Sequence, residues 1–417
     1  MGHSYTEQKY LRIAKNDVLA IRLFWCGFIL YTLAYTLTKT TQVNYLVSQF
    51  IQGVSIFIFS VGAILLFKFK FENNYLKWLF ILYYSWLFFV VPRGILLDYA
   101  SIKLLLFDAW FGLFIYFAPL ILLFKKKLGF YKIAFDVIFV LSAFYILFSL
   151  VFLKDLLQDD LKNLTSQAIV EYFTRALSVP CGFLWLTYIY HSKKRRSALI
   201  FVTLVTLLLV IMRARRALIL ITIFPILIAY IMYVFNHEKR LKMALLSIMA
   251  AIVLALAGYG LYSTSLFGPL RQRGLQDTRS GVEICFSKDM QARDWIFGKG
   301  INGEYFCPNI DPGPSPYRST IETDYLQIIL KGGLINLVLL LLIMIPAAIK
   351  GIFYSKNMLS KAAGYWILLW LLSLYPINVS NFSMSYLLVW ISVGICYSRT
   401  LRDMPEDVFI LYFTGSK

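Results

Sequence analysis

The chain has 417 residues, of which 59% are hydrophobic and only 15% are charged. This composition lies outside the range of soluble globular proteins and predicts a membrane protein that buries most of its length in lipid. The net charge of +19 would suit nucleic-acid binding, but the basic residues fall in short loops between apolar runs, where they act as topology signals. We therefore expect no nucleic-acid partner.

The apolar runs predict about twelve membrane-spanning helices, because a helix needs roughly 20 apolar residues to cross the hydrocarbon core. We expect these helices at 18–37, 44–67, 75–92, 104–124, 133–153, 168–190, 198–212, 217–235, 243–262, 334–349, 364–377 and 384–397. One large loop, 263–323, separates helices nine and ten. The first apolar run has no cleavage site, so we interpret it as a retained signal anchor. The sequence thus predicts an all-α polytopic membrane protein with a single transmembrane domain, 1–417.

The loops predict the orientation of these helices. Lys and Arg gather before the first helix, after the even-numbered helices and after the last one, which places these segments and both termini in the cytoplasm. The loop with Asp155, Asp159 and Asp160 is acidic and falls on the opposite side. We expect a multi-pass protein of the bacterial inner membrane, with the 263–323 loop in the periplasm.

Several arginines lie on the periplasmic face, against this rule. The turn between helices seven and eight contains Arg213, Arg215 and Arg216. The large loop contains Arg271, Arg273, Arg279, Arg293 and Arg318, and the outer ends of helices three and six carry Arg93 and Arg175. Guanidinium groups bind phosphate oxygens bidentately and stay charged, so a lipid diphosphate is a fitting ligand. Interfacial snorkelling of long side chains is the alternative.

Charged side chains within the predicted helices have local partners in sequence. We expect Asp136 to pair with Lys132, and Glu171 with Arg175, because each pair is one helical turn apart.

The large loop contains a segment rich in glycine and aromatic residues, 291–303. Its glycines would let backbone N–H groups approach a ligand closely, although an ordinary turn is the alternative. Glu322 and Asp324 then head the next apolar helix. In the structural interpretation, the two carboxylates stabilise the helix dipole. In the functional interpretation, a carboxylate facing the arginines acts as a general base or orients an acceptor hydroxyl, and Tyr325 is a further candidate.

The cysteines divide into two groups. Cys26, Cys181 and Cys396 lie within predicted helices as packing residues, whereas Cys285 and Cys307 share the large loop, where an oxidising compartment predicts a disulfide. The outer face has no histidine and no cysteine cluster, so we expect no metal site.

The segment 291–334 resembles the O-antigen polymerase and ligase superfamily. The resemblance rests on an arginine, an aromatic residue and a Gly-x-Gly cluster, followed by a Leu and Gly-Leu pattern: Arg293, Trp295, Gly298, Gly300, Leu326, Gly333 and Leu334. Glu322-Thr323 stands where the family has His-Asn. The three histidines, His3, His191 and His237, lie in segments assigned to the cytoplasm. This departure disfavours a histidine-dependent ligase and favours the polymerase (Wzy) branch.

The resemblance implies a metal-independent, inverting glycosyltransferase without a cofactor. It would transfer a growing O-antigen or capsule glycan from undecaprenyl diphosphate to a sugar hydroxyl of another lipid-linked repeat unit. The catalytic candidates are Glu322 as the base or orienting carboxylate, Asp324 as its reserve, and Arg293, which would also bind the diphosphate. The other diphosphate-binding candidates are Arg213, Arg215 and Arg216, with Arg271 and Arg273 in second place. Partners would be the lipid-linked oligosaccharide, membrane lipid, and a chain-length regulator and flippase of the same pathway. The alternatives are a ligase acting on lipid A core and a transporter of the lipid-linked unit.

Overall fold

The computed structural model describes residues 15–40, 43–124, 127–156, 164–236, 268, 279–308 and 315–415. Within these ranges, six helices are long and apolar enough to cross a membrane: α2 (Lys15–Leu37), α3 (Tyr45–Leu66), α7 (Leu128–Val151), α11 (Lys193–Met212), α12 (Arg216–Asn236) and α17 (Asp324–Phe353). Shorter apolar helices accompany them, including α18 (Met358–Ser373) and α19 (Met384–Tyr397). This content is compatible with the expected all-α membrane protein. The ninth predicted helix, 243–262, lies outside the described residues.

The chain forms two compact units. Unit 1 comprises Met1–Leu65, Lys126–Leu275 and Glu406–Lys417, and unit 2 comprises Leu66–Lys125 and Gln276–Pro405.

Unit 1 contains α2, most of α3, α7, α11 and α12, with shorter helices between them: α8 (Leu153–Leu156), α9 (Leu164–Phe173), α10 (Cys181–Leu186) and α21 (Glu406–Thr414). Its core combines aliphatic and aromatic side chains, and Trp25 packs against Phe28 and Phe130. The sixth predicted helix, 168–190, is broken into α9, a π-helical turn (Thr174–Ser178), α10 and a 3₁₀ turn (Tyr188–Tyr190). Pro180 explains the break, since proline has no N–H for the helical ladder.

The two predicted ion pairs of unit 1 have different outcomes. Arg175 Nη2 lies 2.5 Å from Glu171 Oε1, as expected. The expected partner of Asp136 is wrong: its Oδ1 contacts Arg195 Nη2 at 2.5 Å, a residue of α11. A tertiary contact between helices therefore replaces the pair one turn apart.

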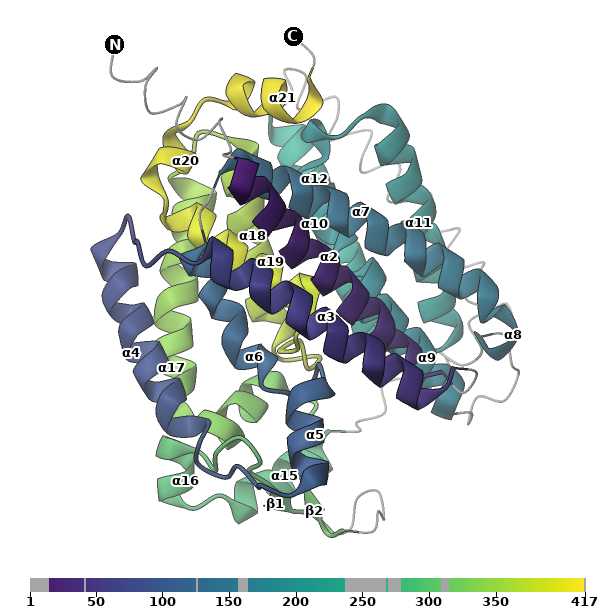
Figure 1. The fold of residues 1–417 in the computed structure, drawn as a ribbon, viewed down its shortest axis with the longest axis vertical. Helices are drawn as coiled ribbons and strands as arrows, with labels where there is room; N and C mark the ends of the chain where they lie inside the picture. The colour runs from purple at the N-terminus through teal and green to yellow at the C-terminus, as the bar shows by residue number, and fades with distance from the viewer. Residues whose placement is uncertain are drawn as a thin grey trace. The chain divides into compact units, whose positions relative to one another are not determined.

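Unit 2 is built around α17, the long green helix of Figure 1, which packs against α4 (Asn74–Val90), α16 (Ala292–Phe297), α18 and α19. The prediction of one helix over 104–124 is wrong: this range covers the end of α5 (Tyr99–Phe107), then α6 (Phe114–Phe117) and a 3₁₀ helix (Ala118–Leu123). The Asp108 carboxylate accepts hydrogen bonds from the N–H groups of Trp110 and Phe111 at 2.6 and 2.9 Å, and this turn ends α5. The small helix α20 (Arg399–Asp403) follows α19.

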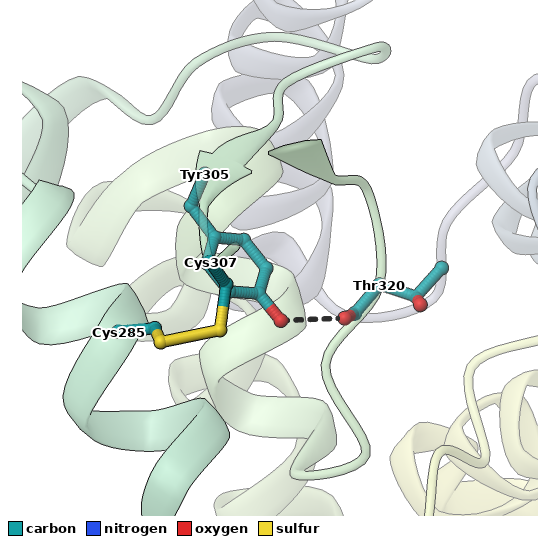
Figure 2. Close-up of a disulfide and its surroundings, with 4 residues drawn as sticks. All are labelled: Cys285, Tyr305, Cys307 and Thr320. Carbon is teal, nitrogen blue, oxygen red and sulfur yellow. Dashed lines mark hydrogen bonds between the residues drawn. A yellow bond between two sulfur atoms is a disulfide. The ribbon is translucent and has the colours of Figure 1, made fainter. Parts of the chain in front are cut away.

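The described part of the large loop is folded. It contains α15 (Ser280–Asp289), α16 and a two-stranded antiparallel sheet of β1 (Tyr305–Phe306) and β2 (Tyr317–Arg318). Phe286, Tyr305 and Leu330 belong to a hydrophobic cluster that joins this segment to α17. Cys285 and Cys307 form a disulfide with their Cα atoms 5.3 Å apart, which is the pairing that the sequence predicts (Figure 2). Beside it, the Tyr305 hydroxyl donates to the Thr320 carbonyl at 2.9 Å.

We expect the double substitution Cys285→Ser and Cys307→Ser to destabilise this segment by about 3 kcal/mol, because the disulfide restricts the unfolded chain. The unfolding temperature in detergent should fall, and trypsin should cut the 279–323 segment faster. Cys26→Ser, which removes a free cysteine, is the control. Wild-type digestion rates in the double variant would contradict the expected role of the disulfide.

Candidate functional site

The site in unit 2 begins with a break in α17 at Gly333. This glycine has φ 72° and ψ 179°, a conformation that is almost exclusive to glycine. Around the break, three successive carbonyl groups of the helix accept hydrogen bonds from other segments. The Trp86 indole donates to the Gly332 carbonyl at 2.8 Å, and the other two donors come from the Gly-rich segment.

The Gly-rich segment is attached to α17 through its backbone. The N–H groups of Lys299 and Gly300 donate to the carbonyls of Leu330 and Lys331 at 2.7 and 2.9 Å. Next to them, the N–H of Ile301 donates to the Arg93 carbonyl at 3.2 Å. Gly300 has φ +85°, and a Cβ there would lie 1.8 Å from the Arg93 carbonyl oxygen. The glycines of the predicted motif therefore allow close backbone packing rather than a ligand's approach.

A polar stripe runs along the otherwise apolar α17. Asp324, Gln327 and Lys331 are spaced three and four residues apart, which places them on one helical face, and all three are buried. Asp324 Oδ2 accepts hydrogen bonds from the N–H groups of Val379 and Ser380 at 2.9 and 2.7 Å. Buried ionisable side chains in a candidate membrane span are costly and usually functional.

Lys331 is the most unusual member of the stripe. Its ammonium donates to the Gly303 carbonyl at 2.9 Å. An ammonium has three N–H donors, so this single bond leaves two available for a ligand. Gln327, in contrast, is engaged through both ends of its amide, by the N–H of Ile321 and the carbonyl of Ser319.

The stripe lines a cavity of about 70 Å³. Eight further lining residues are polar or aromatic, and four are aliphatic: Tyr83, Trp110, Phe111, Tyr116, Asn336, Asn378, Ser380 and Tyr386, and Ile115, Ile301, Ile328 and Leu340. This volume holds a few water molecules or the hydroxyl groups at one edge of a sugar. Hydroxyl donors beside aromatic rings, with one buried cation and one buried carboxylate, suit a polyhydroxylated ligand.

Two arginines gather where the Gly-rich segment meets the end of α4. Arg93 Nη2 donates to the Phe297 carbonyl at 2.5 Å, and its guanidinium lies 4.7 Å from the Phe89 ring centre. Burial lowers the pKa of Arg93, the positive charge of Arg293 lowers it further, and Asp294 opposes both effects. Arg293 itself is exposed and forms no hydrogen bond or ion pair with any described residue. Two nearby cations with one nearby carboxylate leave a net positive charge, which favours an anion.

The two predicted carboxylates occupy different environments. Asp324 is fully buried at the cavity, whereas the Glu322 side chain is 65% exposed and pairs with Arg279 Nε at 3.3 Å. Tyr325 stacks on Tyr375 with ring centres 6.5 Å apart. The sequence favours Glu322 as the base or orienting carboxylate, with Asp324 as its reserve. Burial favours the reverse order, because Asp324 lines the cavity and Glu322 faces solvent.

The turn that contains Arg213, Arg215 and Arg216 belongs to unit 1. Arg213 is buried and donates from Nε and Nη2 to the Leu156 carbonyl, at the end of α8. Arg215 Nη1 lies 3.2 Å from Glu171 Oε2, so Glu171 is shared by Arg175 and Arg215. Arg216 begins α12. These contacts give Arg213 and Arg215 structural partners, and their binding of diphosphate stays a prediction.

Arg271 and Arg273 lie outside the described residues, as do Asp159, Asp160, His3 and His237. In the part of the chain that the structure describes, no group of three His, Cys, Asp or Glu side chains could hold a metal ion. Lys331 is not among the site residues expected from the sequence. Its spacing does indicate it, because a lysine seven residues after an aspartate lies on the same face of an apolar helix.

No protein-family model matches the chain, and comparison with the curated proteins and with the solved structures finds no similar protein.

Proposed function

We propose that the protein is a polysaccharide polymerase that transfers a growing O-antigen or capsule glycan from undecaprenyl diphosphate to a sugar hydroxyl of another lipid-linked repeat unit. One observation carries the proposal. The segment that resembles the polymerase family presents Arg293 and is attached by its backbone to the helix whose buried face brings Asp324 and Lys331 to a cavity.

The proposed chemistry needs few groups. An acceptor hydroxyl attacks the anomeric carbon of the donor sugar, the bond from that carbon to the diphosphate oxygen breaks, and the configuration inverts. The departing diphosphate is a good leaving group, so the enzyme chiefly has to hold its charge and position the acceptor. Arg293 and Arg93 would hold the diphosphate.

Asp324 is the better candidate for the carboxylate that orients or deprotonates the acceptor hydroxyl. It lines the cavity, while Glu322 is exposed and paired with Arg279. Lys331 would donate hydrogen bonds to the sugar or to the leaving oxygen. The proposed reaction uses a lipid-linked donor, so it requires no nucleotide sugar. Arg93 and Arg293 would balance the charge of the leaving diphosphate, so no metal ion is needed for that role.

The proposed topology follows from the charge distribution. Twelve spans, with both termini in the cytoplasm of a bacterium, would place the 279–323 segment and Arg293 in the periplasm, on the outer face of the inner membrane. Arg215 and Arg216 would be further cations of the same face.

Purified protein, mixed in detergent with lipid-linked repeat units, tests the proposal. We expect a ladder of lengthened lipid-linked glycans on gels, and Arg293→Ala should lower the rate of its formation by about a hundredfold, the effect of losing one charged donor to a leaving group. Arg399→Ala, which removes an arginine that is paired with Asp403 in the same unit, is the matched control.

The rivals give different products. A transporter yields no lengthened glycan from purified components, and a ligase yields product only after lipid A core is added. Either result would replace the polymerase proposal. A normal ladder from both Arg293→Ala and the double variant Arg93→Ala and Arg293→Ala would remove the arginines from the mechanism.

A further inference from the structure

Unit 1 contains a second, larger cavity of about 440 Å³. It lies among α7, the start of α11 and α21, and every lining residue belongs to unit 1. Four cationic side chains and one carboxylate line it: Lys132, Lys193, Arg195, Arg196 and Asp136. The proposed polymerase reaction uses none of these residues.

The positive charge in this cavity is only partly compensated. Arg195 pairs with Asp136 at 2.5 Å, and Arg196 Nε donates to the His191 carbonyl at 2.8 Å. The ammonium groups of Lys132 and Lys193 form no ion pair with any described residue. Lys132 lies 5.7 Å from the ring centre of Tyr412. A surplus of cations around a cavity of this size indicates an anionic ligand.

The first turn of α11 adds to the positive potential. This 20-residue helix begins at Lys193, and Ser192 is its N-cap, with its side chain accepting from the Arg195 N–H at 3.4 Å. The N-terminal end of a helix carries a partial positive charge, and backbone N–H groups there point toward a ligand.

His191 supplies an independent sign of a ligand. The residue is 1% exposed and lines the cavity, and its Nδ1 has no hydrogen-bond partner among the described residues. Nε2 lies 3.1 Å from Thr187 Oγ1, whose own proton is donated to the Phe183 carbonyl at 2.8 Å. Nε2 therefore carries the imidazole proton, and Nδ1 is an acceptor. Burial, followed by the charges of Arg195 and Arg196, lowers the pKa of His191 to about 3, so the ring is neutral near pH 7.

The cavity also lies at the end of two candidate membrane spans. One span begins at Leu128, four residues before Lys132, and the other begins at Lys193. The ends of such spans lie at the depth of lipid phosphates.

We propose that this cavity binds a phosphate group whose ester carries a free hydroxyl, the chemistry of a glycerophosphate. Lys132, Lys193 and the first turn of α11 hold the phosphate, and His191 Nδ1 accepts the hydroxyl proton in a hydrogen bond. The ligand is the headgroup of phosphatidylglycerol or free glycerol phosphate, which present the same groups.

Native mass spectrometry of the full chain tests the site. Protein is taken from nanodiscs of phosphatidylglycerol and phosphatidylcholine and compared with Lys132→Gln plus Lys193→Gln. Neither substitution removes an ion pair seen within the described residues. We expect wild type to retain phosphatidylglycerol selectively and the double variant to retain it at least about tenfold less, the loss expected from a single charge-assisted hydrogen bond. Arg22→Gln plus Lys154→Gln removes the same charge from unit 1 at residues that do not line the cavity, and is the matched control.

The source of the phosphate is decided by a second measurement. If the ligand is a lipid headgroup, glycerol phosphate at millimolar concentration does not displace the retained phosphatidylglycerol. If the ligand is free glycerol phosphate, adding it raises the unfolding temperature of wild type but not of the double variant. Equal retention by wild type, the double variant and the control, together with no stabilisation by glycerol phosphate, would overturn the proposal.

A third variant isolates the histidine. His191→Phe removes the acceptor and keeps an aromatic ring, so the preference for phosphatidylglycerol over phosphatidylcholine should fall while binding of sulfate, which has no hydroxyl, stays unchanged. An unchanged preference would exclude the hydroxyl contact.

Discussion

Replacing Lys331 by methionine is expected to lower the rate of glycan lengthening by about 10²- to 10³-fold, the usual effect of removing one positioned donor from an enzyme site. The physical reason is that this buried ammonium lines the cavity with Asp324 and makes a single hydrogen bond to the protein, to the Gly303 carbonyl. The stability of the protein should stay the same or rise. A buried charge without a paired carboxylate is costly to desolvate, and methionine fills a similar volume without that cost.

Loss of activity without loss of stability is therefore the expected signature. The rate is measured from lipid-linked products on gels, and the unfolding temperature is measured in the same detergent. Lys288→Met, at the exposed end of α15, should leave both quantities at the wild-type level. A Lys331→Met protein that unfolds well below the wild-type temperature would make the lysine structural, and one with wild-type activity would exclude it from the site.

Substituting alanine for Gly333 is expected to destabilise unit 2 by at least about 3 kcal/mol, because two costs add. The backbone at Gly333 has φ +72°, and a Cβ would lie 2.0 Å from the Ile296 carbonyl oxygen. To relieve this contact, the end of α16 has to move away from α17. The N–H groups of Lys299 and Gly300 would then lose their acceptors on α17.

Gly94→Ala separates the two costs. Gly94 has φ +91°, but a Cβ there meets no atom closer than 3.5 Å, so this variant carries only the backbone strain. Unfolding temperature and the rate of trypsin cleavage within 279–323 are measured for both variants. We expect a much larger change in Gly333→Ala. Equal changes would mean that close packing of the Gly-rich segment contributes little.

The sequence by itself determined the features that depend on local composition and periodicity. The helix predicted at 384–397 is α19, with the same bounds. The pairing of Glu171 with Arg175 followed from their spacing, and the pairing of Cys285 with Cys307 followed from their shared loop. Each of these features depends only on residues nearby in sequence, or on the compartment that the segment faces.

The tertiary structure decided everything that depends on partners distant in sequence. Asp136 pairs with Arg195 on another helix, and Arg213 holds the Leu156 carbonyl, 57 residues away. Glu322 and Asp324 are two residues apart, and only packing shows that one is exposed and the other lines the cavity. The periodicity of a helix shows which residues share a face, but the neighbours that bury that face determine whether a charge meets solvent, a carbonyl or a ligand. For the arginines, this difference separates Arg213, engaged by the fold, from Arg293, which remains available for an anion.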